Sequence, residues 1–277
     1  MVKRPVKITL YILLLNLFCL SGCDDDFLNF LTSTDLDKRL AEKDNFKYLG
    51  SRGGTTLSLK NENDYSFIVL TDTHIEDGDA FGLEKIADVI QNNSQIEFAV
   101  VLGDISNYGA TKDIKKFIEI SDLFKVPCYP VIGNHDILLN NWKNWKDLIG
   151  STNYHIAGNG INLLILDSAN SFFGKQQLNW LESKIKNSKG NTFVFTHCNF
   201  FVNTIDIQQS SDPKERARII SILQNKCDIA FSGHAHERYI NSAGNVQYIT
   251  IEDYKSKKVY CIVTVKDSVV TYKFEKL

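Results

Sequence analysis

The pattern of apolar and polar residues along this chain forms two kinds of segment, short apolar runs and longer amphipathic stretches. From residue 65 onward, short apolar runs of strand length end in polar residues, as in FIVLTD, EFAVVLGD, CYPVIGN, INLLILD, TFVFTH and DIAFSGH. Longer segments lie between these runs, and their apolar residues recur at three- and four-residue intervals over 83–92, 114–124, 176–187 and 213–224. That spacing predicts amphipathic helices. Strands that alternate with helices predict βαβ units and a layered α/β fold.

The pattern changes near the C-terminus, where three strand-like runs follow one another with only short turns between them. They read VQYITIED, KVYCIVTVK and SVVTYKFE. Successive strands with short connections favour antiparallel pairing, so we expect a largely helix-free C-terminal part. The sequence contains no internal repeat, and we expect residues 65–277 to form one mixed α/β domain.

The first 22 residues have a pattern of their own, in which a short basic region leads into an apolar run from Ile8 to Leu20. This run is shorter than the ~20 residues that span a bilayer, so it fits the core of a signal peptide better than a transmembrane helix. The LSGC motif at 20–23 resembles the lipobox of bacterial lipoproteins, in which small residues precede a cysteine that is acylated. The resemblance implies a lipoprotein signal peptide at 1–22 and a membrane anchor on Cys23. The alternative is a conventional signal in which Cys23 has no role.

A polar segment separates this region from the predicted domain. Residues 23–64 are rich in acidic residues, Ser, Thr and Gly, which predicts a tether that holds the domain away from the bilayer. A short helix is expected to begin near Thr34 or Asp35, since both are good N-cap residues. An acylated Cys23 would place the protein in the cell envelope, lipid-anchored to a bacterial membrane. Whether it faces the periplasm or the cell surface stays open.

Composition agrees with an ordinary globular protein, because 43% of the residues are hydrophobic and 23% are charged. The net charge is −2, and the predicted signal peptide contributes only bases to that balance. An acidic chain gains little from displacing counterions from a polyphosphate, so we expect no nucleic-acid binding. Beyond residue 23 no C-x-x-C spacing occurs, and we expect packing rather than zinc or redox chemistry from the remaining cysteines. In an oxidising compartment they permit three disulfide pairings, none of them required: Cys128, Cys198, Cys227 and Cys261.

Residues able to bind metal follow nearly every predicted strand. Five of the six histidines lie just past the end of an apolar run, together with two aspartates and one asparagine. In open α/β sheets, ligand sites form outside the carboxyl ends of the strands, so we expect one crevice to collect these side chains. Imidazole, carboxylate and amide groups without a thiolate favour zinc, manganese or iron. The set comprises Asp72, His74, Asp104, Asn134, His135, His197, His234 and His236.

The same residues form five blocks that carry a family resemblance: DTH at 72–74, GD at 103–104, GNHD at 133–136, His197, and GHAH at 233–236. In this order they resemble the motifs of the calcineurin-like metallophosphoesterase superfamily, D-x-H, GD, GNH[DE], H and GHxH. The resemblance implies a four-layer αββα sandwich, in which helices flank two mixed β-sheets. It also implies metal-dependent hydrolysis of a phosphodiester or a phosphomonoester.

Carried over motif by motif, the resemblance implies a binuclear centre with two divalent ions as cofactors: manganese, iron or zinc. Asp104 would bridge the two metals, because a carboxylate offers two oxygens. His135 would remain as the general acid that protonates the leaving oxygen. The other ligands would divide into two sets, with Asp72, His74 and His236 on one metal and Asn134, His197 and His234 on the other.

Asn107 departs from the pattern of some branches of the superfamily. Purple acid phosphatases have a tyrosine ligand at this position, and Tyr108 comes one residue too late, which argues against a ferric-tyrosinate centre. The aspartate that orients the acid histidine in Ser/Thr protein phosphatases is also missing. We therefore expect Asn107 to orient His135 through its side-chain oxygen.

Four residues near the motifs have an ordinary structural interpretation. Arg238 follows the last block, where a surface arginine is more common than a phosphate ligand. Trp142 and Trp145 have the three-residue spacing of a helix face that packs on the core, with a lid over the site as the alternative. His155 is expected to be structural or exposed.

Two functional hypotheses remain. The first is an active metal-dependent phosphoesterase, and the second is a lipoprotein that keeps the fold as a binding or scaffolding module. The complete set of motif residues favours the enzyme, because a degenerate relative is expected to lose at least one ligand or the acid histidine.

Overall fold

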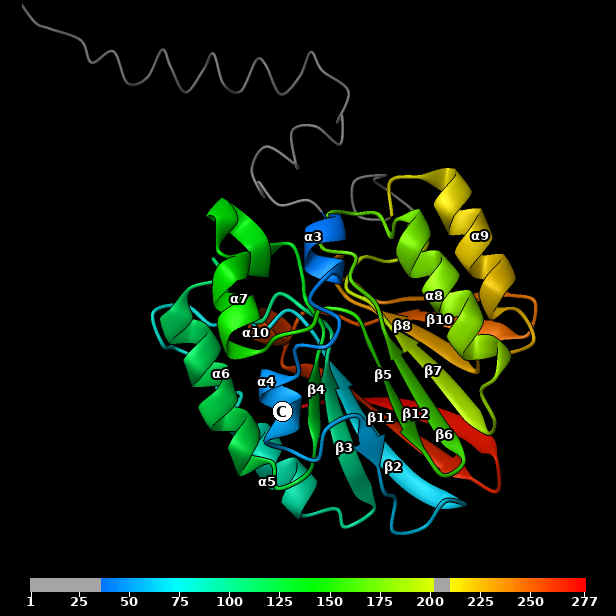
Figure 1. The fold of residues 1–277 in the computed structure, drawn as a ribbon. Coiled ribbons are helices and arrows are strands. Elements are labelled where there is room, and N and C mark those ends of the chain that lie inside the picture. Colours follow the sequence, from blue (N-terminus) through cyan, green and yellow to red (C-terminus); the bar gives the residue numbers. More distant parts are fainter. Residues whose placement is uncertain (1–35, 202–209) are drawn as a thin grey trace, which may run out of the picture.

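Two β-sheets pack face to face, and helices cover the outer face of each sheet (Figure 1). The computed structural model describes residues 36–201 and 210–277. The predicted signal peptide, Cys23 and the expected helix start at Thr34 or Asp35 lie outside the described residues. The layers form the αββα sandwich that the family resemblance implied.

Both sheets mix parallel and antiparallel pairs. The larger sheet has the order β1-β5-β6-β7-β8-β10-β9, with parallel pairing from β6 through β10. The smaller sheet has the order β12-β11-β2-β3-β4, with β2, β3 and β4 parallel. The strands of the larger sheet are β1 Thr56–Leu57, β5 Tyr154–Gly158, β6 Ile161–Ile165, β7 Asn191–Phe195, β8 Ile229–Ser232, β9 Tyr239–Ala243 and β10 Val246–Thr250. Those of the smaller sheet are β2 Asp64–Leu70, β3 Ile96–Val101, β4 Cys128–Pro130, β11 Val259–Lys266 and β12 Val269–Lys276.

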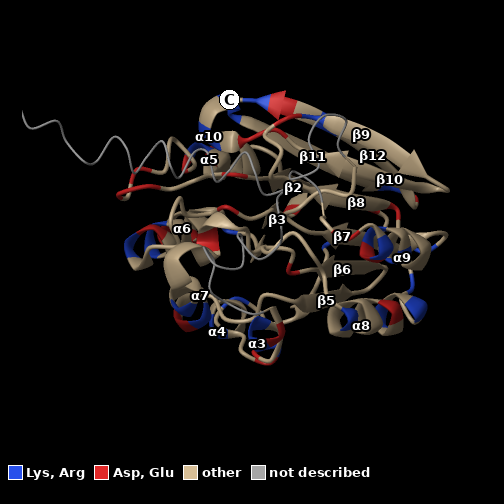
Figure 2. Cartoon of the chain, turned by 90° about the horizontal axis from the view of Figure 1, so that it is seen from above, with Lys and Arg blue, Asp and Glu red and all other residues tan. Residues whose placement is uncertain are grey.

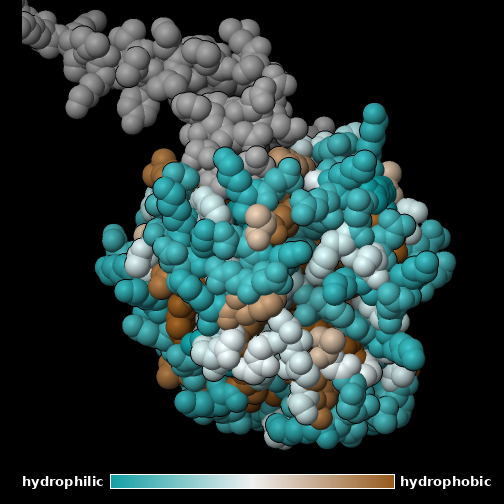
Figure 3. Space-filling model, in the orientation of Figure 1, coloured by the Kyte–Doolittle hydropathy of each residue, from teal (hydrophilic) through white to brown (hydrophobic). Residues whose placement is uncertain are grey.

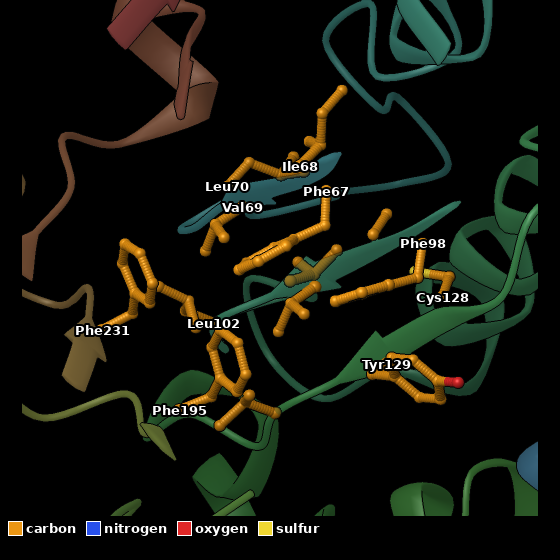
Figure 4. Close-up of a cluster of buried hydrophobic side chains, with 14 of the residues drawn as sticks. Phe67, Ile68, Val69, Leu70, Phe98, Leu102, Cys128, Tyr129, Phe195 and Phe231 are labelled. Atoms are coloured by element: carbon orange, nitrogen blue, oxygen red, sulfur yellow. The ribbon is translucent and has the colours of Figure 1, made fainter. Parts of the chain in front are cut away.

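Aromatic rings fill the space between the sheets (Figure 4). Phe67 of β2 stacks on Phe98 of β3 with ring centroids 4.6 Å apart. Its edge meets Phe193 of β7, in the opposite sheet, at 4.9 Å. Phe195 and Phe231 stack beside this pair at 5.6 Å. Because burial of such side chains is the main favourable term in folding, these rings hold the two sheets at a fixed spacing.

Amphipathic helices form the outer layers at the positions that the periodicity predicted. In α6 the buried residues recur at intervals of three and four positions. In α9 the Asp212 side chain caps the helix by accepting from the Lys214 backbone at 2.7 Å. Viewed from above, the charged residues of α6, α8 and α9 lie on the outer layers, while the strands are mostly uncharged (Figure 2). The described helices are α3 Leu36–Leu40, α4 Lys47–Gly50, α5 Lys85–Gln91, α6 Thr111–Leu123, the 3₁₀ helix η1 His135–Asn140, α7 Trp142–Leu148, α8 Lys175–Lys186, α9 Pro213–Leu223 and α10 Tyr254–Lys257.

The described part of the expected tether packs onto the domain. Leu36 and Leu40 of α3 are buried, and Arg39 between them is fully buried. The Arg39 guanidinium forms a two-point ion pair with Asp167, at 2.7 and 2.9 Å, and also donates to Asn170 at 2.6 Å. Asp167 follows β6, so this contact fixes α3 beside the carboxyl end of the larger sheet.

The C-terminal strands differ from the simple antiparallel series that we expected. β10 runs parallel to β8 in the larger sheet, and β11 starts in the smaller sheet, where it lies antiparallel to β2. The short helix α10 joins the two sheets at this point. β11 and β12 pair antiparallel as expected, and β10 pairs antiparallel with β9, but β10 and β11 do not pair with each other. The expected pairing of these two strands was wrong because a loop that changes sheet has the same local sequence pattern as a hairpin turn.

The four cysteines of the described chain are buried and carry free thiols: Cys128, Cys198, Cys227 and Cys261. They serve as small packing residues, as expected. Figure 3 shows a mostly hydrophilic face with scattered hydrophobic residues. Among residues 36–201 and 210–277, no helix has the length and apolar character needed to cross a membrane.

Candidate metal centre

The carboxyl ends of β2, β3, β4, β7 and β8 meet at one edge of the sandwich, where each is followed by predicted site residues. Parallel strands bring these ends together because their chain direction is shared within each sheet. Asp72 and His74 follow β2, and Asp104 follows β3. The structure brings together the residues predicted for the site from both sheets.

Asp104 lies at the middle of this group and is 1% exposed. Its Oδ2 is 3.3 Å from His197 Nε2 and 3.8 Å from His74 Nε2. The same oxygen is 3.9 Å from His135 Nε2. A carboxylate this close to imidazoles from both halves of the site is in the position that a bridging ligand requires.

The first group of potential ligands surrounds Asp72, which is fully buried. Its Oδ1 is 3.1 Å from His236 Nε2 and 3.7 Å from His74 Nε2. The two imidazole nitrogens are 3.4 Å apart. One carboxylate and two imidazoles therefore point at a single small volume that could hold a metal ion.

The second group lies on the other side of Asp104. His197 Nε2 is 2.9 Å from the side-chain oxygen of Asn134. The rings of His197 and His234 meet at 4.9 Å, and donor atoms of both lie within 4.8 Å of an Asp104 oxygen. Asp104 also forms a group with His74 and His135, so it lies between the two predicted ligand sets, and the division of ligands between two metals stays a prediction.

Hydrogen bonds on the outer side of the ring orient three of the histidines, His74, His135 and His197. His197 Nδ1 donates to the Leu102 carbonyl at 2.8 Å, and His135 Nδ1 donates to the Asn107 carbonyl at 2.9 Å. His74 Nδ1 lies 3.2 Å from the Asn107 side-chain oxygen. Since a carbonyl oxygen can only accept, these contacts place the proton on Nδ1 and leave Nε2 directed at the cluster, as metal-ligating histidines require.

Asn107 therefore acts differently from our expectation. Its side-chain oxygen faces His74, one of the predicted ligands, and its backbone carbonyl contacts His135. The sequence identified the residue but not which of its oxygens faces which ring, because that depends on the path of the loop after β3.

The backbone is strained at the site. Asp72, Asp104 and His234 have φ angles of 53°, 47° and 68°, in the left-handed region that residues with a Cβ rarely adopt. Gly133 shows how closely the loops approach, because a Cβ there would collide with the backbone nitrogen and carboxylate of Asp104. Strain of this kind persists where the surrounding structure fixes the chain, and it is common at functional sites.

The charges of the cluster suit a metal. Burial by itself would raise the pKa of Asp104, but the positive charge of His197 and its hydrogen bond outweigh this and lower the pKa to about 2. Burial likewise opposes ionisation of Asp72, and hydrogen bonds from His236 and His74 hold its pKa well below the usual value. Two ionised carboxylates amid imidazoles, with an amide oxygen beside them, form the donor set of a divalent-metal site.

Asp136 is a structural participant that our sequence analysis did not assign a role. Its buried carboxylate accepts from the backbone nitrogens of Gly133 and Ser106, both at 2.9 Å, and of Ile105 at 3.3 Å. It thus joins the loop after β3 to the loop after β4. The sequence feature that could have pointed to Asp136 is its position directly after His135 in the GNHD block.

The other residues considered near the motifs have structural roles. Arg238 pairs with Glu252 at 2.8 Å and lies 3.8 Å over the Phe274 ring, which confirms a surface role. Trp145 is fully buried in α7, so this helix packs on the core and the lid alternative was wrong. His155 lies 3.2 Å from the Asn162 side chain.

Comparison with known proteins adds family context. Residues 65–238 match the family described as calcineurin-like phosphoesterase. A probable cyclic nucleotide phosphodiesterase of Xenorhabdus bovienii is 27% identical over 157 residues, which are 53% of this chain and 64% of that protein. A probable cyclic nucleotide phosphodiesterase of Fibrobacter succinogenes is 28% identical over 199 residues, 65% of this chain and 77% of that protein.

Solved structures share the fold at low sequence identity. A dimetal phosphatase from Danio rerio gives a TM-score of 0.60 at 14% identity, over 76% of this chain and 96% of that one. The purple acid phosphatase PPD1 from yellow lupin gives 0.61 at 13% identity, over 79% of this chain and 52% of that one. GAP50 of Plasmodium, described as an anchor in the inner membrane complex, gives 0.58 at 14% identity, over 77% of this chain and 85% of that one.

Proposed function

Because the chain belongs to the calcineurin-like phosphoesterase family, we propose that it hydrolyses a phosphodiester with the help of two divalent metal ions. The names of the two bacterial relatives support a diester rather than a monoester. The observation that carries the proposal is the position of Asp104, within 4 Å of three imidazole nitrogens that reach it from separate loops.

The residues divide into two roles. One metal would be held by Asp72, His74 and His236, and the other by Asn134, His197 and His234, with Asp104 shared. When bound, such a pair supplies positive charge for the phosphoryl oxygens and makes hydroxide available at neutral pH. The chain itself contributes fixed ligand directions, since outer hydrogen bonds hold the rings of His74 and His197.

His135 would donate a proton to the leaving oxygen. Its Nδ1 is engaged by the Asn107 carbonyl, so Nε2 is the nitrogen that faces the site. Its side chain is 33% exposed, whereas that of His197 is 1% exposed. A group that must contact a substrate and exchange protons with water needs this access.

The direct test uses a fragment that begins after Cys23, loaded with manganese and assayed with bis-p-nitrophenyl phosphate. We expect hydrolysis that a chelator abolishes and that fresh manganese restores. Asp104→Ala should have the largest effect, because this side chain alone contacts both ligand sets, and Arg238→Ala should retain activity. Folded protein that is inactive with manganese, zinc, cobalt and iron would favour the scaffold hypothesis.

We also propose that Cys23 is acylated and anchors the protein to a bacterial membrane of the cell envelope. The LSGC motif after the apolar run supports this proposal. Expressed in a bacterium, the full chain should fractionate with membranes and carry acyl chains, and Cys23→Ser should remain unacylated. Wild-type protein that is soluble and unacylated would contradict the anchor without affecting the proposed hydrolysis.

A further inference from the structure

His197 lies just past the point where the backbone pairing between β6 and β7 ends. A bond from the Leu166 nitrogen to the Phe195 carbonyl, at 2.9 Å, extends this pairing one residue beyond β6. His197 and Cys198 follow, and both are buried. A buried backbone N–H without an acceptor costs free energy, so the chain must supply an acceptor here that the neighbouring strand does not provide.

The Ser168 hydroxyl is this acceptor. Its oxygen accepts from the Cys198 nitrogen at 2.8 Å and from the His197 nitrogen at 3.2 Å. The Thr196 hydroxyl donates to the same oxygen at 2.6 Å. Ser168 is 1% exposed, so bulk water does not compete for these bonds. One side chain therefore contacts three consecutive residues, with the predicted metal ligand His197 in the middle.

The loop that carries Ser168 is held in turn by two helices. Gln177 of α8 accepts from the Asp167 nitrogen at 2.8 Å and donates to the Asp167 carbonyl at 2.7 Å. Arg39 of α3 forms its ion pair with the Asp167 carboxylate and also donates to Asn170. Buried contacts on both sides of Ser168 therefore set the position of its hydroxyl.

His197 has two further anchors. Its Nδ1 donates to the Leu102 carbonyl at 2.8 Å, and its carbonyl accepts from the Gly233 nitrogen at 2.9 Å. These bonds fix the outer edge of the ring and the C-terminal side of the residue, whereas Ser168 fixes its N-terminal side. Without the Ser168 hydroxyl, the backbone at this point would be free to shift and to carry Nε2 away from Asp104, which it faces at 3.3 Å.

We propose that Ser168 is a positioning residue for the metal ligand His197. The inference rests on the proposed function, because it requires His197 to bind a metal ion. A ligand that is fixed before the metal arrives loses less conformational entropy when it binds. Loss of an outer contact that orients a ligand lowers metal affinity by about 10- to 100-fold in well-studied sites. Ser168 should therefore contribute to metal affinity through the backbone that it holds.

The test compares wild-type protein with Ser168→Ala by calorimetric titration of manganese. We expect the variant to bind manganese about tenfold more weakly at one site. Saturating manganese should restore kcat on bis-p-nitrophenyl phosphate, because every ligand is still present. Ser168→Cys fills the same space with a weaker acceptor, so it should have an intermediate affinity and replaces Ser168→Ala if that variant does not fold.

The matched control is Ser66→Ala. Ser66 is 2% exposed, and its hydroxyl bonds to that of Thr264 at 2.8 Å, near the amino end of β2 and away from the metal centre. This variant also removes one buried hydroxyl with a hydrogen bond. It should leave manganese affinity unchanged.

Amide hydrogen exchange of chelator-treated protein gives a second readout that needs no metal. In Ser168→Ala, the amides of His197 and Cys198 should exchange about tenfold faster relative to that of Phe98 in the core, in line with the loss of one hydrogen bond. A merely structural role would destabilise the whole fold, accelerate all three amides alike and overturn the inference.

The outcomes distinguish this inference from the proposed function. Equal manganese affinity in wild type and Ser168→Ala would overturn the positioning role and leave the hydrolase intact, and so would an equal loss of affinity in Ser66→Ala. Wild-type protein that binds manganese but hydrolyses no ester would overturn the proposed function, while the affinities would still decide the role of Ser168.

Discussion

His135 and His234 belong to the same cluster of imidazoles, yet replacing each should reduce activity in a different way, because one is the proposed acid and the other a proposed ligand. A general acid matters in proportion to how badly the leaving oxygen needs a proton. His135→Ala should therefore keep both metals, lose ~10²- to 10⁴-fold on alkyl esters, and lose distinctly less on p-nitrophenyl esters, whose leaving group is stable as an anion. His234→Ala should lower metal content and depress both ester types together.

Metal analysis of the purified variants, with kcat/KM on the two esters, checks this division of roles. An equal loss on both esters in His135→Ala, or an empty metal site, would contradict this division of roles.

The pH dependence of metal binding follows from His197. Burial would lower the pKa of this imidazole, but the negative charge of Asp104 outweighs it and raises the pKa to about 9 in the absence of metal. A ligand must be neutral, so binding has to release this proton below pH 9, and apparent metal affinity should rise from pH 6.5 to 9. The stability of chelator-treated protein depends on pH in the opposite direction. The His197–Asp104 pair stabilises the fold fully below about pH 6.5, and this stabilisation is lost as the pH rises to 9.

Calorimetry of manganese binding in buffers of different ionisation enthalpy measures the released protons. His197→Asn, which replaces the titrating imidazole with an amide that does not titrate, should release fewer protons. Proton release that is the same in wild type and His197→Asn would contradict the assignment.

The site residues could be predicted from the sequence because each lies just past an apolar run, and this local pattern can be recognised without knowledge of the fold. The contacts that orient them did not come from the sequence. Leu102 acts through a backbone carbonyl, which every residue possesses. The Ser168 hydroxyl accepts from the His197 backbone at 3.2 Å, and nothing in the local sequence marks it as a contact of that residue. Only the path of the backbone in space selects them.

At the scale of elements, α3 is held to the domain by a fully buried ion pair. Removing one partner of such a pair leaves an uncompensated charge out of contact with water, so Arg39→Met should destabilise the fold by about 3 to 5 kcal/mol. The double variant Arg39→Met/Asp167→Leu should recover part of this loss, because two apolar groups can replace a buried pair. Denaturant unfolding of the two variants measures the difference, and equal stabilities of Arg39→Met and wild type would contradict it.

The same helix shows where hydrophobic patterning fails. Arg39 reads as a surface residue in LDKRL, and nothing local indicates that Asp167 will neutralise it. β5 and β9 were also absent from our predicted strands, because both contain exposed or partly buried positions and lack a continuous apolar run. The six central strands and four long helices were predictable because each buries a complete face.

At the scale of the whole molecule, the sandwich was predictable from the order of its elements and the family resemblance, whereas the assignment of the C-terminal strands to sheets was not. β10 and β11 are neighbours in sequence and lie in different sheets. Pairing between distant segments decides this, and short-range patterns carry no information about it.

The metal centre also divides between the sheets. Asp72, Asp104 and Asn134 come from loops after strands of the smaller sheet, and His197 and His234 from loops after strands of the larger one. Ions bound here would therefore link the two sheets at this end of the sandwich. A ligand that binds only the folded state makes any partial unfolding that pulls its binding residues apart less frequent.

Amide hydrogen exchange should consequently detect metal binding in strands that lie far from the site. Chelation should accelerate exchange in β2, β3, β7 and β8 together, including amides buried near Phe67 and Phe193, while the outer pair β11–β12 changes less. Acceleration confined to the loops would mean that the aromatic core alone holds the sheets together. Coordinated acceleration in both sheets would mean that the metals complete a single cooperative unit, and that metal scarcity shortens the lifetime of the folded protein as well as its activity.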